Sequence, residues 1–183
     1  MGTCKKTMEV NFVAKESRIK PVSRFNEIMD MLKGYSTSIY TNEDDGYDYL
    51  DDGYFCIAVL NPAGEDDLYI DIEDGFTLTY GDWDAHYEPY PRQYQHMCED
   101  IGKFLNGESY LAVVNCGKDW ICSLSIDGSK IDKAALNGKI KDFLHSADCD
   151  VFIGQMNKNG CEINCNFWDV KMSRTFCLRP GEF

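Results

Sequence analysis

The apolar residues of the chain change their spacing several times, and each change predicts a new element of secondary structure. Within residues 20–34 they recur at the spacing of one helix face, whose members are Phe25, Ile28, Met29 and Leu32. Pro21 near the start and Gly34 after the end are typical of helix boundaries. The pattern therefore predicts a first helix over these residues.

The next part of the chain follows the pattern of strands. A continuous apolar run at 53–60 predicts a buried strand, and apolar and polar residues alternate at 68–72. A third strand is expected at 76–80, because turn-forming residues occupy 61–64 and 73–75. Three strands joined by short turns predict an antiparallel meander.

The second half of the chain combines helical and strand patterns. One helix is expected to begin at Pro91 and to end before Gly107. Another follows Ser129, which forms a capping-box pattern with Asp132. The remaining strands are expected at 110–115, 120–126, 151–155, 161–167 and 175–178.

These elements predict an α+β fold, arranged as a single domain over residues 1–183. Hairpins dominate, so we expect a mostly antiparallel sheet with about three helices packed on one face. The order helix–strand–strand occurs at least twice, which leaves a duplicated unit as an alternative. A length of 183 residues, 44% of them hydrophobic and 27% charged, is ordinary for one globular domain and excludes a wholly disordered chain.

Two features bear on the cellular compartment. The longest apolar run, at 54–60, is far shorter than the roughly 20 residues of a membrane-spanning helix, and residues 1–9 lack the apolar core of a secretory signal. The nine cysteines form an odd set without a C-x-x-C motif, which is typical of reduced thiols. We expect a cytoplasmic protein that makes no contact with a membrane.

The charge is distributed unevenly along the chain. The formal net charge is -13, which disfavours direct binding of nucleic acid. Residues 34–91 contain 15 of the acidic residues and not one lysine or arginine, and nine of the 11 tyrosines lie in the same segment. Tyrosine is enriched in protein interfaces because it adds a large amphipathic area with few rotatable bonds.

Two interpretations of this segment stay open. One is a solvated loop that keeps the protein soluble. The other is an anionic face, studded with tyrosines, that attracts a basic protein and accelerates its association. The candidate partner-binding residues are Glu43, Asp44, Asp45, Tyr47, Asp48, Tyr49, Asp51, Asp52, Asp66, Asp67, Asp82, Trp83, Asp84, His86 and Tyr87.

Two further groups of residues have the composition of a metal site. Asp82, Asp84 and His86 would share one face if the strand at 76–80 continued, and could then serve a small metal-dependent hydrolase. Neither a nucleophile elbow nor an H-E-x-x-H motif accompanies them. A zinc site is the other alternative, formed by Cys116, Cys122, Cys161 and Cys165, although buried thiols explain these cysteines more simply. We therefore expect no catalytic residues, no metal and no cofactor.

The stretch from Gly81 to Tyr87 reads Gly-Asp-Trp-Asp-Ala-His-Tyr, follows a strand and precedes a helix. It resembles a pattern in small immunity proteins of bacterial polymorphic and contact-dependent toxin systems. The resemblance covers residues 68–126 and depends on Gly81, Trp83, His86 and Tyr87. It implies a cytosolic, acidic, non-enzymatic protein that occludes the active site of a toxin.

Charge pattern and resemblance together favour a non-catalytic inhibitor that binds a basic protein, such as a nuclease toxin or another nucleic-acid-binding effector. Surface carboxylates can occupy the positions of nucleic-acid phosphates and pair with the arginines and lysines of the partner. A phage-type decoy against a host nuclease would have the same surface. A homodimer is a further alternative, in which the lysine cluster of the third helix, at 130–141, binds the acidic segment of a second copy.

Overall fold

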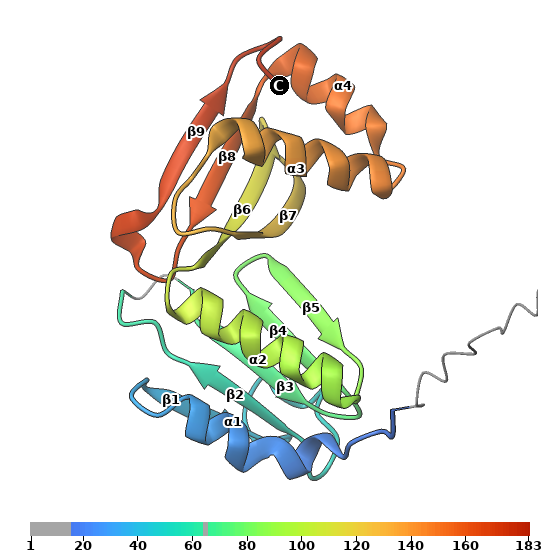
Figure 1. Cartoon of the computed structure of the whole chain (residues 1–183), viewed down its shortest axis with the longest axis vertical. Coiled ribbons are helices and arrows are strands. Elements are labelled where there is room, and N and C mark those ends of the chain that lie inside the picture. Colours follow the sequence, from blue (N-terminus) through green and yellow to red (C-terminus); the bar gives the residue numbers. More distant parts are fainter. Residues whose placement is uncertain (1–15, 64–65) are drawn as a thin grey trace, which may run out of the picture.

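The computed structural model of the chain describes residues 16–63 and 66–183. Residues 1–9, from which we expected no secretory signal, lie outside these ranges, and so does the cysteine among them, Cys4. Gly64, at the end of the predicted turn 61–64, also lies outside them. The fold is α+β, with four α-helices, two short 3-10 helices and nine strands among the described residues. The strands form two antiparallel sheets, which follow one another along the long axis of the molecule (Figure 1).

The first sheet is a meander of five strands in the order β1-β2-β3-β4-β5. Each strand pairs antiparallel with its neighbour in the sequence. The connections after β3 and β4 are too short to join parallel strands. The strands are β1 (Thr37–Tyr40), β2 (Phe55–Val59), β3 (Leu68–Ile72), β4 (Phe76–Tyr80) and β5 (Trp83–Tyr87).

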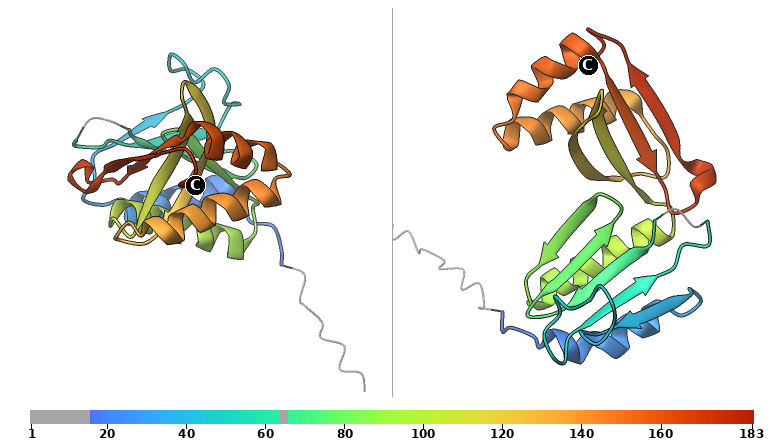
Figure 2. Two further views of the ribbon diagram at one scale, coloured as in Figure 1. Left: turned by 90° about the horizontal axis from the view of Figure 1, so that it is seen from above. Right: turned by 180° about the vertical axis from the view of Figure 1, so that it is seen from behind.

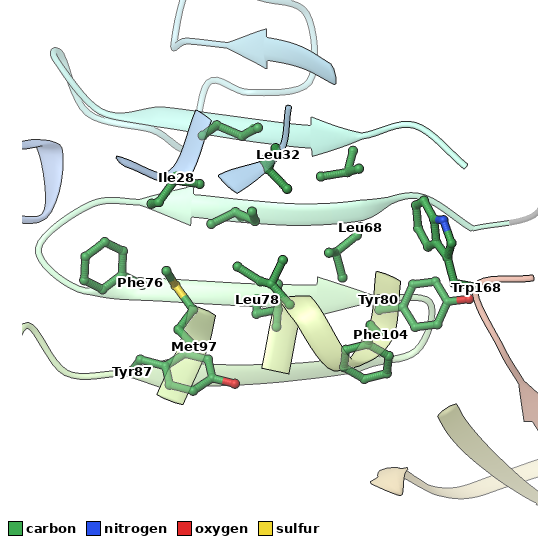
Figure 3. Packing of buried hydrophobic residues seen from close by; sticks show 14 of the residues in the cluster. Ile28, Leu32, Leu68, Phe76, Leu78, Tyr80, Tyr87, Met97, Phe104 and Trp168 are labelled. Atoms are coloured by element: carbon green, nitrogen blue, oxygen red, sulfur yellow. The ribbon is translucent and has the colours of Figure 1, made fainter. Parts of the chain in front are cut away.

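Two helices cover one face of this sheet, α1 (Phe25–Met31), preceded by η1 (Pro21–Arg24), and α2 (Pro91–Leu105). Ile28 from α1 and Phe104 from α2 are fully buried against alternate residues of the strands (Figure 3). Pro91 is the first residue of α2, as its sequence position predicted, since the missing N–H of proline costs nothing there. Seen from behind, the strands lie in front of α2, and no described helix covers this side (Figure 2).

The second sheet has the order β7-β6-β8-β9. Its helices again lie on one face and bury a second apolar cluster. The elements are β6 (Ser109–Cys116), β7 (Asp119–Asp127), α3 (Lys133–Ser146), α4 (Asp150–Asn159), β8 (Cys161–Asn166), η2 (Val170–Met172) and β9 (Arg174–Leu178).

The two sheets are connected through the core. Leu111 and Val113 of β6 point away from α3 and α4 and belong to the apolar cluster of the first sheet. Trp168, which follows β8, joins the same cluster beside Tyr80 at its end (Figure 3). The first core is therefore completed by residues from the second half of the chain.

The α+β class and the antiparallel pairing were predicted correctly, and four details differ from the sequence analysis. The strands form two sheets, where we expected one. Residues 151–155 belong to α4, because their spacing also fits a helix and Met156 and Phe152 pack on the second core. β1 was missed. Ser129 does not cap α3, since Asp132 accepts hydrogen bonds from Ala134 N and Ala135 N.

The duplicated helix–strand–strand unit is not reflected in the packing. α2 packs on the first sheet, where it contacts β4 and β5, and it also contacts β6, the first strand of the hairpin that follows it in the second sheet. α3, in contrast, packs on the same sheet as the hairpin that follows it in the chain. The two units therefore have different surroundings.

Candidate functional site: the acidic face of the first sheet

The side of the first sheet that faces away from α1 and α2 carries polar residues. Ile70, Leu78 and other alternate residues point into the core, so Asp71, Thr77 and His86 point the opposite way. We call this side, together with the adjoining loop 41–54 and the turn after β3, the acidic face. Its carboxylates belong to Asp71, Glu73, Asp74, Asp84, Glu88 and the acids between 43 and 52.

The loop 41–54 is fixed against the sheet. Leu50 is buried, and so are Cys56 and Ala58, which point away from the helices and would otherwise face solvent. Tyr49 donates its hydroxyl hydrogen to Asp71 Oδ1 at 3.0 Å, and Tyr54 donates to Asp74 Oδ1 at 2.7 Å. The acids of the loop are thereby held over β2 and β3.

Aromatic contacts strengthen this attachment. The rings of Tyr40 and Tyr47 are stacked with centroids 4.1 Å apart, and Tyr49 lies 6.0 Å from Tyr47. Burial, followed by the charge of Asp71, raises the pKa of Tyr49 well above its usual range. Burial also raises the pKa of Tyr47, with a smaller contribution from Cys56. Both phenols therefore remain neutral at physiological pH.

A hollow of about 460 Å³ lies at the end of the acidic face. Asp51, Glu73, Asp74 and Glu88 line it, together with His86 and Arg18. Burial raises the pKa of Glu73, and the charges of Asp71, Asp51 and Asp74 raise it further. These carboxylates are consequently close enough to repel one another.

Among the described residues, the carboxylates of the loop form no ion pair, although Arg18 lines the same hollow as Asp51. In the part of the chain that the structure describes, lysines and arginines form ion pairs with Glu27, Asp30, Asp100 and Asp127. None of them pairs with an acid between 43 and 52. The loop therefore presents a negative field to solvent.

The structure distributes the predicted partner-binding residues over several places. Glu43, Asp45, Asp48, Asp51 and Asp52 are exposed on the loop, and Tyr47 and Tyr49 connect it to the sheet. His86 lies between Thr77, 2.9 Å from its Nδ1, and Asp84, 3.3 Å from its Nε2. Asp51 and His86 line the same hollow, which connects the loop with β5.

Other predicted residues have structural roles. Asp44 accepts a hydrogen bond from Thr41 N and closes the turn after β1. Asp67 accepts one from Asn61 N, and Asp66 lies beside Gly81, both at the opposite end of the sheet. Asp66 and Asp67 are therefore removed from the acidic face, whereas Asp44 stays on its loop with one oxygen engaged by Thr41.

The stretch 81–87 differs most from its prediction. The chain reverses at Gly81 and Asp82, so Asp82 lies in a turn and not in line with Asp84 and His86. Trp83 packs against Phe104 on the helix side, and Tyr87 is buried with its hydroxyl donating to Asp100. Tyr87 thus cannot contact a partner.

The structure does not bring together either group of residues that was considered as an alternative metal site. Among residues 16–63 and 66–183, no three His, Cys, Asp or Glu side chains converge on a metal position. The described cysteines are free thiols, and burial raises the pKa of Cys122 and Cys165 to about 12 and that of Cys161 to about 11. Cys116 donates to the carbonyl of Gly160. Cys122, Cys161 and Cys165 therefore stay protonated inside the second core.

Sequence reasoning missed several residues of the acidic face. Asp71 carries a signal, because the alternation at 68–72 places it opposite the apolar residues. Glu73, Asp74 and Glu88 lie in turns, where no periodicity exists. Only the hydrogen bond from Tyr54 to Asp74 and the shared hollow connect them to the loop.

Comparisons with protein-family models, curated proteins and solved structures found no match to this chain. Within the described residues, no helix has the length and apolar character needed to cross a bilayer. The arrangement of the side chains is therefore the basis for assigning a function.

Proposed function

We propose that this protein is a non-catalytic inhibitor that binds a basic protein through the acidic face. The observation that carries the proposal is that tyrosine hydrogen bonds attach the loop to the sheet, while the loop acids form no ion pair with a described lysine or arginine. A loop that is already attached loses less conformational freedom on binding, so more of the interaction energy remains as affinity. A negative field of this kind also accelerates the arrival of a basic partner.

The partner class follows from the chemistry of the face. Guanidinium groups form bidentate hydrogen bonds with carboxylates, and the tyrosine rings add apolar contact area between the charges. A nuclease or another nucleic-acid-binding effector has a surface rich in such cations. The resemblance of residues 68–126 to immunity proteins favours a toxin as the partner, and a phage-type decoy of a host nuclease would work by the same contacts.

The test compares two variants with the same change in charge. The first, Asp45→Asn, Asp48→Asn and Asp52→Asn, removes three loop carboxylates that make no hydrogen bond to another described residue. The control, Glu16→Gln, Asp119→Asn and Asp142→Asn, removes three exposed carboxylates elsewhere. The protein encoded by the neighbouring gene is the first partner to test, followed by proteins captured from the native lysate.

Association is measured by biolayer interferometry at low and high ionic strength. We expect the loop variant to associate at least about tenfold more slowly at low salt, with a flatter salt dependence, and the control to behave as the wild type. Equal association rates for both variants would contradict the proposal. Self-association without binding of another protein, detected by light scattering, would also contradict it. The acidic face would then bind the lysine cluster of a second copy of the chain.

A further inference from the structure

The second sheet also has a face without helices, but its side chains are of a different kind. Alternate residues of β6, β7, β8 and β9 point away from α3 and α4. Leu111 and Val113 of β6 are on this side and pack into the first core. The residues around them are neutral and polar, and the set consists of Asn115, Ser123, Ser125, Asn164, Asn166 and Thr175. We call this surface the amide face.

Trp120 stands at the edge of the amide face, directly across from Asn115 in the strand register. Its side chain is 57% exposed, yet its Nε1 donates a hydrogen bond to Ser123 Oγ at 2.9 Å. The bond fixes the orientation of the indole and satisfies its only polar atom. An apolar ring surface is thus held open to solvent, which packing within the chain does not explain.

A hollow of about 450 Å³ adjoins this ring. Asn115, Asn164 and Asn166 line it from the amide face, and Asp82 lines it from the β4–β5 turn of the first sheet. A second hollow of about 290 Å³ shares Asp82 and Trp120 and extends toward Phe143. Together they form a cleft between the two sheets, within the size range of roughly 300–1,000 Å³ typical of small-molecule sites.

The hydrogen-bonding capacity of the cleft is only partly used. Asn164 accepts from Thr175 and donates to Glu162, so its carboxamide is committed. The carboxamides of Asn115 and Asn166 make no hydrogen bond to another described residue. Each offers two donors and one acceptor toward the cleft.

We propose that this cleft binds a neutral saccharide of two or more rings. The exposed face of Trp120 would cover the C–H face of one ring, while Asn115, Asn166 and Asp82 would exchange hydrogen bonds with its hydroxyls. A hydroxyl both donates and accepts, which matches carboxamides and a carboxylate placed side by side. The site goes beyond the proposed inhibitor function and lies mainly on the second sheet, with Asp82, Trp83 and Asp84 contributed by the first.

Other ligand classes fit less well. Among the described residues no lysine or arginine lines the cleft, and Asp82 would repel a phosphate or a carboxylate. A nucleobase could stack on the indole, but the phosphates of a nucleotide would meet the same repulsion. The uncharged nucleosides therefore form the alternative that the experiment must separate from saccharides.

The test titrates the full chain with cellobiose, lactose, maltose and chitobiose, and with adenosine, guanosine, cytidine and uridine, following tryptophan fluorescence. We expect saturable binding of at least one disaccharide. Trp120→Ala and Asn166→Asp should each weaken it by about tenfold or more, because they remove the stacking surface and two donors respectively. Asn26→Asp, on the exposed side of α1, makes the same chemical change as the second variant and should leave affinity unchanged.

Each other outcome would overturn the proposal. The first is that no disaccharide gives a saturable signal, and the second is that only nucleosides bind. The third is that both cleft variants bind the disaccharide as tightly as the wild type. Circular dichroism establishes whether each variant is folded. If Trp120→Ala does not fold, Trp120→Phe replaces it, and this variant should retain part of the affinity because it keeps an aromatic surface. Isothermal titration calorimetry checks the affinities by a second readout.

Discussion

The two sheets are built alike and differ in the surfaces that they expose. Both are antiparallel, both carry two helices on one face, and in neither does a helix of the described residues cover the opposite face. The first exposes carboxylates such as Asp71 and Asp84, whereas the second exposes carboxamides and hydroxyls such as Asn166 and Ser125. The fold therefore provides two platforms, and the residues at alternate strand positions decide what each can bind.

The loops amplify this difference. A loop of 14 residues, 41–54, joins β1 to β2 and adds acids and tyrosines to the first platform. The corresponding connection between β6 and β7 is the two-residue turn Gly117-Lys118, which leaves Trp120 uncovered. The first platform is suited to a large partner, and the second keeps an open cleft.

The sharpest test of whether the two regions are coupled is the change Phe104→Ala in α2. Phe104 is fully buried and contacts Tyr80 and Trp83, so we expect a loss of about 3–5 kcal/mol in the free energy of unfolding, measured by urea denaturation. Hydrogen exchange should also accelerate in β6, because Leu111 and Val113 belong to the same cluster. Phe143→Ala, at a residue 41% exposed on α3, is the control and should cost about 1 kcal/mol or less.

Replacing one glycine in each region by alanine tests how strongly the surrounding structure restricts the backbone at that position. Gly160, between α4 and β8, has φ +78° and ψ 174°, and a Cβ there would overlap the carbonyl oxygen of Leu178. We expect Gly160→Ala to cost about 2–3 kcal/mol. Gly46 in the acidic loop has φ +87° with open space around it. Gly46→Ala should therefore lower the free energy of unfolding by only about 1 kcal/mol. Equal thermal shifts would show that the clash at Gly160 is relieved by movement of β9.

Two carboxylates should respond to pH in opposite directions. The raised pKa of Glu73 means that its charged form is disfavoured in the folded state, so stability falls as the pH rises above the ordinary glutamate value of about 4.3. Burial opposes ionisation of Asp127, but hydrogen bonds from Ser109 and Lys103 outweigh it and lower its pKa. Its contribution is present at neutral pH and is lost as the pH falls through that lowered pKa.

Accordingly, Glu73→Gln should stabilise the protein at neutral pH and have little effect in acid, whereas Asp127→Asn should destabilise it at neutral pH. Both changes should amount to less than about 1 kcal/mol, because the groups are partly exposed. Thermal midpoints recorded from acidic to neutral pH give the comparison. The same sign for both variants at neutral pH would contradict it.

The smallest expected effect is that of the loop acids on stability. Asp45→Asn, Asp48→Asn and Asp52→Asn together should raise the free energy of unfolding by about 0.5 kcal/mol or less at low salt, since they relieve mutual repulsion. Added salt should remove the gain through screening. A marked destabilisation would instead mean that these carboxylates hold the loop in place.

Much of the first region was predictable from its periodicity. The strands at 68–72 and 76–80 and the helix from Pro91 have the expected bounds, because one of their faces is apolar and the other is not. Prediction was wrong where this signal is ambiguous or absent. The apolar residues at 151–155 fit a strand or a helix, and β1 has only four residues with Ile39 exposed.

The candidate site divides in the same way. The sequence alone determined that the negative charge and the tyrosines lie in residues 34–91, because composition is a property of the chain. It also placed Asp84 and His86 on one side of a strand, since side chains alternate.

Only the tertiary structure decided which of these residues meet. The turn at Gly81 separates Asp82 from Asp84, Tyr87 is directed into the core, and Tyr49 and Tyr54 attach the loop to Asp71 and Asp74. It also placed Asp82 opposite Trp120, a residue of the other sheet. Such contacts join residues far apart in the chain, and they depend on how whole elements pack, which no local pattern of residues encodes.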